Sequence, residues 1–160
     1  MRACACLLLL SLFVCAGCGP PVDITTGLQV QNVVTGWFDA GIVNGQNKLV
    51  PSIAFTLKNV SNQKLAVLQV SAAFRRLTVK DPWGERFLRV TGSEGLAPGR
   101  ATPTLTIRSA LGYTGSDQTR EDMLRNREFV DAEVELFAKY GSTQWKRIGE
   151  YPIARRLITK

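Results

Sequence analysis

The stretch SIAFTLKNVSNQKLAVLQVSAAF, residues 52–74, contains two segments in which apolar side chains alternate with small or polar ones. The alternating apolar residues are Ile53, Phe55 and Leu57 before the polar break at 61–63, and Leu68, Val70, Ala72 and Phe74 after it. A period of two predicts β-strands, each with one buried face. Two strands of about seven residues are not stable alone in water, so the flanking sequence must supply further strands to cover them.

Alternating or short apolar runs predict these additional strands on both sides of the pair. They lie at 28–38, 74–80, 85–91, 102–108, 130–139 and 144–153. The first has a slipped alternation, which indicates a bulge or a change of sheet. Glycine, asparagine and proline predict a loop at 39–48, with room for a short strand at 41–43, and breaks at 92–99 and 112–115. Pro51 cannot donate to a ladder, so we expect it at the start or the edge of a strand.

One helix is predicted, at residues 119–126. Thr119 can cap it, Glu121 and Asp122 lie in its first turn, and Arg125 lies in its last, as the helix dipole favours. We expect it to plug one open end of the core.

This pattern predicts a mainly β domain, a two-sheet antiparallel sandwich of immunoglobulin-like type with about seven or eight strands and one short helix. A closed β-barrel is the alternative. The last two strands should form an antiparallel hairpin, because parallel strands would be apolar on both faces. The expected shared core consists of Ile53, Phe55, Leu57, Val70, Phe74, Val134, Leu136 and Trp145.

The net charge of +7 would suit an anionic partner, but the twenty Lys and Arg residues form no run longer than two. An evenly basic surface follows, and nucleic acid is not an expected partner.

The amino terminus has the layout of a secretory signal peptide. A positive start at Met1-Arg2 precedes the apolar run 7–14, and small residues come before Cys18. A membrane-spanning helix needs about 20 apolar residues, and the stretch 3–17 is too short. We therefore expect a signal peptide at 1–17.

The sequence Cys15-Ala16-Gly17-Cys18 resembles a bacterial lipobox, with Cys15 where leucine is usual. The resemblance implies that Cys18 is diacylated and becomes the first residue of the mature chain, so that the protein is anchored in a lipid bilayer. An ordinary secreted protein is the alternative. Residues 18–26 are then a lipid-anchored tether and 27–160 the β-sandwich domain. A glycine directly after the cysteine, here Gly19, resembles the pattern of lipoproteins that are passed on to the outer membrane. We therefore expect the protein on the periplasmic side of the outer membrane in preference to the inner membrane.

Residues from about 51 to 108 also resemble the FxLYD-type immunoglobulin-like domains of bacterial lipoproteins. The matching features are the turn Asn59-Val60-Ser61, the strand 68–74, the turn Asp81-Pro82-Trp83-Gly84 and the pair Pro98-Gly99. The Phe-x-Leu-Tyr-Asp signature itself is replaced by Val79-Lys80 before Asp81.

Composition narrows the possible chemistry. The chain has no histidine, and its four cysteines all lie in the first eighteen residues, which excludes His- and Cys-based catalysis and metal sites from the body. Asp131, Glu133 and Glu135 could form a glycosidase-type pair or a calcium site, but the alternation explains them as the solvated face of a strand. We expect neither an enzyme nor a cofactor or metal site.

A partner site is predicted at the Asp81–Gly84 turn, where Trp83 stands at the tip. Basic residues flank it: Arg75, Arg76, Lys80, Arg86 and Arg89. Such residues would bind acidic groups of a protein or glycan. The alternatives are an indole that folds back onto the sheet, and charges that keep a sheet edge from pairing.

These features predict a membrane-anchored envelope lipoprotein that acts as a non-catalytic binding or scaffolding module for an envelope protein or a glycan. A type VI secretion-like lipoprotein component and a carboxylate-only glycan-active enzyme are the alternatives.

Overall fold

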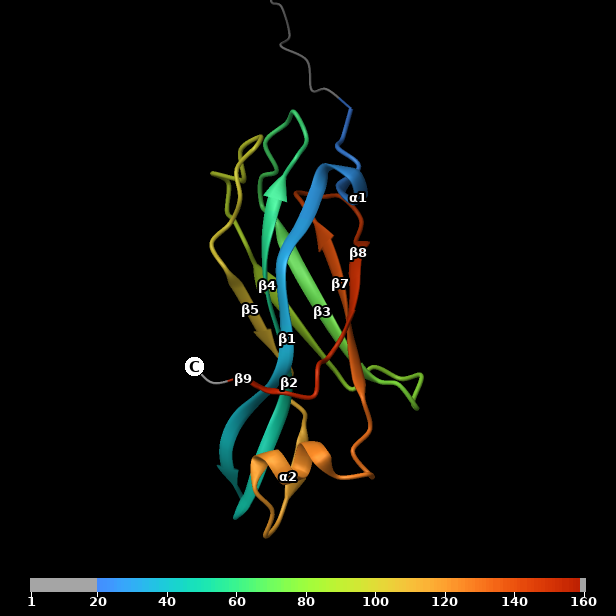
Figure 1. Ribbon diagram of the computed structural model, residues 1–160. Helices are drawn as coiled ribbons and strands as arrows, with labels where there is room; N and C mark the ends of the chain where they lie inside the picture. The colour runs from blue at the N-terminus through green and yellow to red at the C-terminus, as the bar shows by residue number, and fades with distance from the viewer. Residues whose placement is uncertain (1–19, 159–160) are drawn as a thin grey trace, which may run out of the picture.

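The computed structural model describes residues 20–158, so Cys18 lies outside the described residues. Within this range the predicted two-sheet sandwich is confirmed, with nine strands in two open sheets and two short helices (Figure 1). The strand pairs are antiparallel except that of β1 with β9, which is parallel. The elements in chain order are α1 (Ile24–Gly27), β1 (Leu28–Val43), β2 (Gln46–Asn59), β3 (Gln69–Arg76), β4 (Gly84–Arg89), β5 (Leu105–Arg108), β6 (Tyr113–Gly115), α2 (Arg120–Arg125), β7 (Ala132–Lys139), β8 (Lys146–Pro152) and β9 (Leu157–Ile158).

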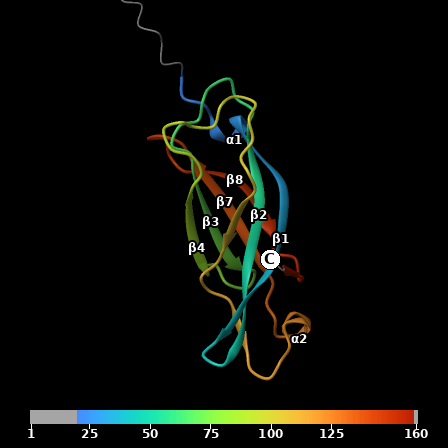
Figure 2. The same ribbon diagram turned by 90° about the vertical axis from the view of Figure 1, so that its left-hand side faces the viewer.

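The two predicted strands of residues 52–74 become inner strands of opposite sheets. One sheet has the order β5-β2-β1-β9, with β6 also paired to β2, and the other has the order β4-β3-β7-β8. Figure 2 shows the two layers from the side. The apolar faces of β2 and β3 therefore meet in the centre, because each sheet must bury its apolar side against the other.

The core is built from these inner faces. Its largest fully buried side chains include Trp37, Phe55 and Phe74. Every residue of the predicted core is buried except Trp145, which is half-buried. The expectation that Trp145 belongs to the core is therefore wrong.

A long hairpin replaces the predicted loop at 39–48. β1 continues to Val43, and Asn44 and Gly45 form a two-residue turn with φ of 51° and 77°. Two positive φ values match the twist of the strands that such a turn connects. The predicted bulge in 28–38 is confirmed between Gln31 and Val34, and a second register shift lies between Asp39 and Ile42.

Pro51 lies inside β2 and not at its start or at an edge of the sheet. The neighbour of β2 changes here, because residues 47–49 pair with β6 and residues 52–55 pair with β5. The carbonyl oxygen of Pro51 accepts from Ser109 N at 3.0 Å. A residue without an N–H is tolerated at this change of partner. The predicted break at 112–115 is also wrong, because this segment contains β6, which pairs with β2.

The predicted helix is confirmed as α2, at the end of the sandwich far from residue 20 (Figure 1). Thr119 is its N-cap, and Thr119 Oγ1 accepts from Asp122 N at 3.1 Å. Met123 and Leu124 are buried against the core. β3 ends at Arg76, four residues before the predicted end of its strand at 80.

The folded domain begins earlier than the predicted boundary at residue 27. Ile24 is buried in the core, and Asp23 caps α1. Two backbone oxygens farther upstream are also held by the sandwich: Pro20 O accepts from Gln63 Nε2 at 3.0 Å, and Val22 O accepts from Tyr140 Oη at 3.2 Å. Of the predicted tether, residues 20–26 thus pack on the domain.

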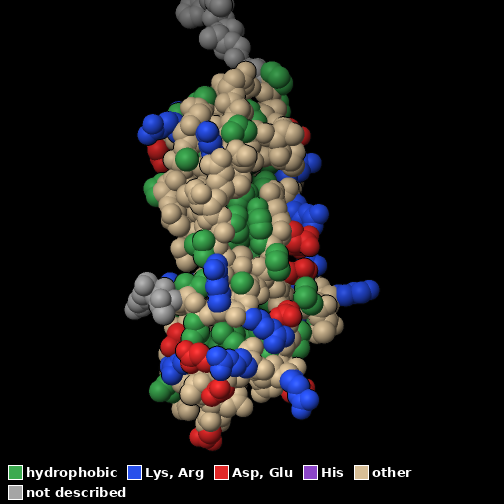
Figure 3. All heavy atoms as spheres, viewed as in Figure 1, with side chains coloured by type: hydrophobic (Ala, Val, Ile, Leu, Met, Phe, Trp, Pro, Cys, Tyr) green, Lys and Arg blue, Asp and Glu red, His purple; other side chains and the backbone are tan. Residues whose placement is uncertain are grey.

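Charges are mixed on the surface. On the face drawn in Figure 3, Lys and Arg side chains are scattered, and acidic side chains lie among them at the end where α2 is placed. Among residues 20–158, no helix is long and apolar enough to cross a membrane.

Candidate functional site

The outer face of the sheet β4-β3-β7-β8 carries aromatic rings as well as charges. Strand alternation points Ser71 and Ala73 of β3 away from the core, since their neighbours Val70, Ala72 and Phe74 are buried in it. The register places Ser71 between Phe87 of β4 and Phe137 of β7. Ser71 therefore lies in the middle of the outer surface that β4, β3 and β7 form.

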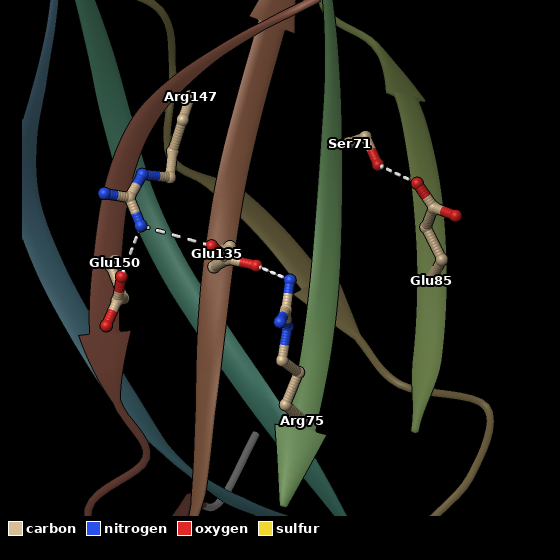
Figure 4. Close-up of polar contacts among 6 residues, drawn as sticks. All are labelled: Ser71, Arg75, Glu85, Glu135, Arg147 and Glu150. Carbon is tan, nitrogen blue, oxygen red and sulfur yellow. Dashed lines mark hydrogen bonds and ion pairs between the residues drawn. The ribbon is translucent and has the colours of Figure 1, made fainter. Parts of the chain in front are cut away.

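An ion-pair network covers the middle of this face (Figure 4). Glu135 of β7 is only 9% exposed although it points outward. Its Oε2 accepts from Arg75 Nη2 and its Oε1 accepts from Arg147 Nη1, the latter at 3.2 Å. Arg147 Nη1 also lies 2.5 Å from Glu150 Oε2. Two arginines thus compensate the charge of a nearly buried carboxylate, as such burial requires.

Beside the network lies a hollow of about 270 Å³, which we call the aromatic hollow. It is lined by Ser71, Glu85, Phe87, Phe137 and Trp145. The Phe87 and Trp145 ring centroids are 5.9 Å apart, with their planes tilted by 56°. Phe87 is 67% exposed. The two rings therefore meet at an angle, with Phe87 open to solvent and Trp145 half-buried.

The polar part of the hollow consists of Ser71 and Glu85 (Figure 4). Ser71 is 2% exposed, and its hydroxyl donates to Glu85 Oε1 at 2.8 Å. This bond satisfies the buried hydroxyl and orients the carboxylate. Glu85 makes no ion pair with any residue in the described range 20–158.

Trp83, the centre of the predicted partner site, is half-buried at the end of the core. Its ring centroid lies 6.1 Å from that of Trp37 and 4.9 Å from that of Tyr113. The guanidinium carbon of Arg76 lies 5.5 Å from the Trp83 centroid. The indole therefore folds back onto the domain, as the alternative interpretation of this turn states.

The structure does not bring the six residues of that predicted site together. Arg76 packs on Trp83, whereas Arg75 belongs to the network around Glu135. Lys80 is exposed in the loop that follows β3, and Arg86 and Arg89 are exposed on β4. A role of these residues in partner binding stays a prediction.

Sequence reasoning did not identify Phe87 as a surface residue. A signal was present, because Phe87 shares its strand face with Glu85 and Arg89, two residues before and after it. An aromatic ring between two charged residues at this spacing predicts an outward position.

Two of the three acidic residues of the predicted strand face, Asp131 and Glu135, pair with arginines, whereas Glu133 forms no ion pair with the residues in the range 20–158. Asp131 Oδ1 accepts from Arg155 Nε at 2.6 Å, and Glu135 is held as described above. Among residues 20–158, no group of three or more metal-ligating side chains is close enough to hold an ion.

No protein-family model matches the chain, and no curated protein matches it. Among solved structures, the chain is similar to an X-ray structure of a structural-genomics target, Northeast Structural Genomics Consortium target SoR45. The two are 13% identical over 82% of this chain and 89% of that chain, with a TM-score of 0.47. A likeness this distant says nothing of function.

Proposed function

We propose that this protein is a lipid-anchored envelope lipoprotein that binds a partner without catalysing a reaction. The observation that carries the proposal is the aromatic hollow, which is concave, open to solvent and lined by three rings and two polar groups. Single exposed apolar residues are common on protein surfaces, but rings that converge with a few polar groups are typical of binding sites.

The anchor is supported by the lipobox resemblance at Cys18 and by the position of the first described residues. Pro20 is already hydrogen-bonded to the sandwich. Two residues of extended chain span about 7 Å, so a lipid on Cys18 would hold the domain close to the bilayer. Gly19 favours the periplasmic side of the outer membrane as the location.

A binding role without catalysis is supported by how the acidic residues are used. Glu135 and Asp131 accept from arginines of the same chain. Ion pairs within the chain account for these two acidic residues without a catalytic role. With histidine missing from the chain and cysteine missing after Cys18, the body of the protein has no residues for His- or Cys-based catalysis.

Photo-crosslinking in intact cells tests the binding surface. A photoreactive phenylalanine analogue is placed at Phe87 and, as a matched control, at Ile42, which is also exposed and lies near the tip of the β1–β2 hairpin. We expect a discrete crosslinked partner from position 87 that disappears when Trp145→Ala is added. Equal crosslinking from both positions, or none from position 87, would contradict the proposal.

Mass spectrometry of the membrane fraction tests the anchor. We expect a mature chain that begins at an acylated Cys18. A Cys18→Ser protein that fractionates exactly as the wild type does would contradict the anchor and leave the binding surface to be judged by the crosslinks.

A further inference from the structure

The walls of the aromatic hollow offer π faces to a ligand. Phe87, Phe137 and Trp145 line it, and the planes of the Phe87 and Trp145 rings are tilted by 56° to each other. The face of an aromatic ring carries negative charge density and attracts cations. The protein already uses this property, because Lys139 Nζ lies 5.0 Å from the Trp145 centroid.

The charged side chain that lines the hollow is negative, as are the faces of the aromatic rings. Glu85 is the one ionisable side chain among the five that line it, and only its Oε1 accepts a hydrogen bond from the described residues. The chain has a net charge of +7, and four of its thirteen carboxylates form ion pairs with arginines, namely Asp39, Asp131, Glu135 and Glu150. Glu135, on the same face, holds two arginines, whereas Glu85 holds none.

We infer that the aromatic hollow binds a positively charged side chain, arginine in preference to lysine, of a partner polypeptide. A guanidinium is planar, stacks on aromatic rings and donates to a carboxylate with a fork of N–H groups. It would stack on Phe87 or Trp145 and donate to Glu85, whose orientation Ser71 fixes. This inference rests on the proposed binding function and adds the chemistry of the ligand.

Titration of the mature, lipidated protein in detergent tests the inference. The probe is Nα-acetylarginine amide, and the matched ligand is Nα-acetylcitrulline amide, which has the same length and planar end without the charge. The readout is the NMR signal of the Trp145 indole N–H, assigned with Trp145→Phe. We expect a saturable shift with the arginine amide and at least about tenfold weaker binding of the citrulline amide, since hydrogen bonds to charged groups are the stronger ones.

Variants locate the effect in the hollow. Glu85→Gln should weaken binding of the arginine amide about tenfold, whereas Glu121→Gln, which removes a similar exposed charge from α2, should leave it unchanged. Phe87→Ala should weaken binding, and Phe87→Tyr should restore it. Both positions are exposed, so the variants keep the fold.

Three results would overturn the inference. The first is equal binding of the arginine and citrulline amides, and the second is a Glu85→Gln protein that binds as the wild type does. The third is a shift of the Trp145 signal by choline or by a neutral sugar at lower concentration than by the arginine amide, which would assign the hollow to a lipid headgroup or a glycan. If one of these results is obtained and position 87 still gives the crosslinked partner, the proposed binding function stands and only the inferred ligand chemistry is wrong.

Discussion

The ring of Trp83 lies 6.1 Å from the ring of Trp37, which is fully buried, and the two planes are tilted by 53°. Tyr113 and Phe129 pack on the same Trp37 ring, at 5.6 and 4.6 Å. The turn at 81–84 therefore closes one end of the core with an aromatic side chain.

Trp83→Ala should consequently destabilise the domain. We expect a loss of about 2 kcal/mol in the free energy of unfolding, because half of a large ring leaves its packing partners. Trp145→Ala is the matched control and should cost less than about 1 kcal/mol, since that ring lies on the outer face. Urea unfolding of both variants makes the comparison, and a larger loss for Trp145 would contradict the assignment of the two rings.

Asn59 is fully buried and should be needed for stability. Its Nδ2 donates to Gln63 O and Leu96 O, both at 2.8 Å, and its Oδ1 accepts from Ser61 N and Ser61 Oγ. Asn59→Ala leaves several of these groups without a partner, so we expect a loss of about 3 kcal/mol. The exposed neighbour Asn62 is the control, and Asn62→Ala should stay within about 0.5 kcal/mol. A loss below about 1 kcal/mol for Asn59→Ala would show that water replaces these bonds.

The pair of Arg75 with Glu135 should show measurable coupling. A double-mutant cycle with Arg75→Met and Glu135→Gln should give about 1–2 kcal/mol, since solvent screening at the partly exposed Arg75 keeps the value below that of a fully buried pair. The exposed pair of Arg155 with Asp131 is the control and should give between about 0 and 1 kcal/mol. Equal coupling energies in the two cycles would mean that burial of Glu135 adds nothing.

Asp23 should contribute to the acid sensitivity of the domain. The backbone N–H of Thr25, and then its hydroxyl, hold the pKa of Asp23 below its ordinary value of 3.8. A lowered pKa in the folded state contributes stability that is present above 3.8 and is lost as the pH falls through the folded-state pKa. Asp23→Asn should therefore lie closest to the wild type at the lowest pH in unfolding experiments over an acidic pH series. A stability difference that stays constant with pH would contradict this role.

Strand alternation predicts which residues face inward, as long as the register has no interruption. It places the core residues of β2, β3 and β7 correctly, because the pairing of 52–55 with 105–108 and that of 69–76 with 132–139 are both continuous. The same rule failed for Trp145. Counting back from Tyr151, which faces the core, would also place Trp145 inside, but a register shift between Leu136 and Phe137 adds one residue to β8 and turns Trp145 outward.

The missed elements have similar causes. Pro51 alone does not reveal that two short strands share one side of β2, because that pairing joins distant segments of the chain. The Gly- and Asn-rich run at 39–48 has the composition of a loop, yet only Asn44 and Gly45 form the turn. The candidate site was hidden for the same reason, since Phe87, Phe137 and Trp145 meet only through the order of β4, β3, β7 and β8.

If Cys18 carries the proposed acyl group, the docking of residues 20–24 on the sandwich would limit how the domain can move on the membrane. With Pro20 and Val22 fixed to the sandwich, an acyl group on Cys18 would leave almost no length over which the protein could swivel. Its reach would then be set by the rigid strands, and β1, with 16 residues at about 3.3 Å each, is about 50 Å long. The far end of the domain would then stay at a nearly constant distance from the bilayer, and partners would be selected partly by their own distance from it.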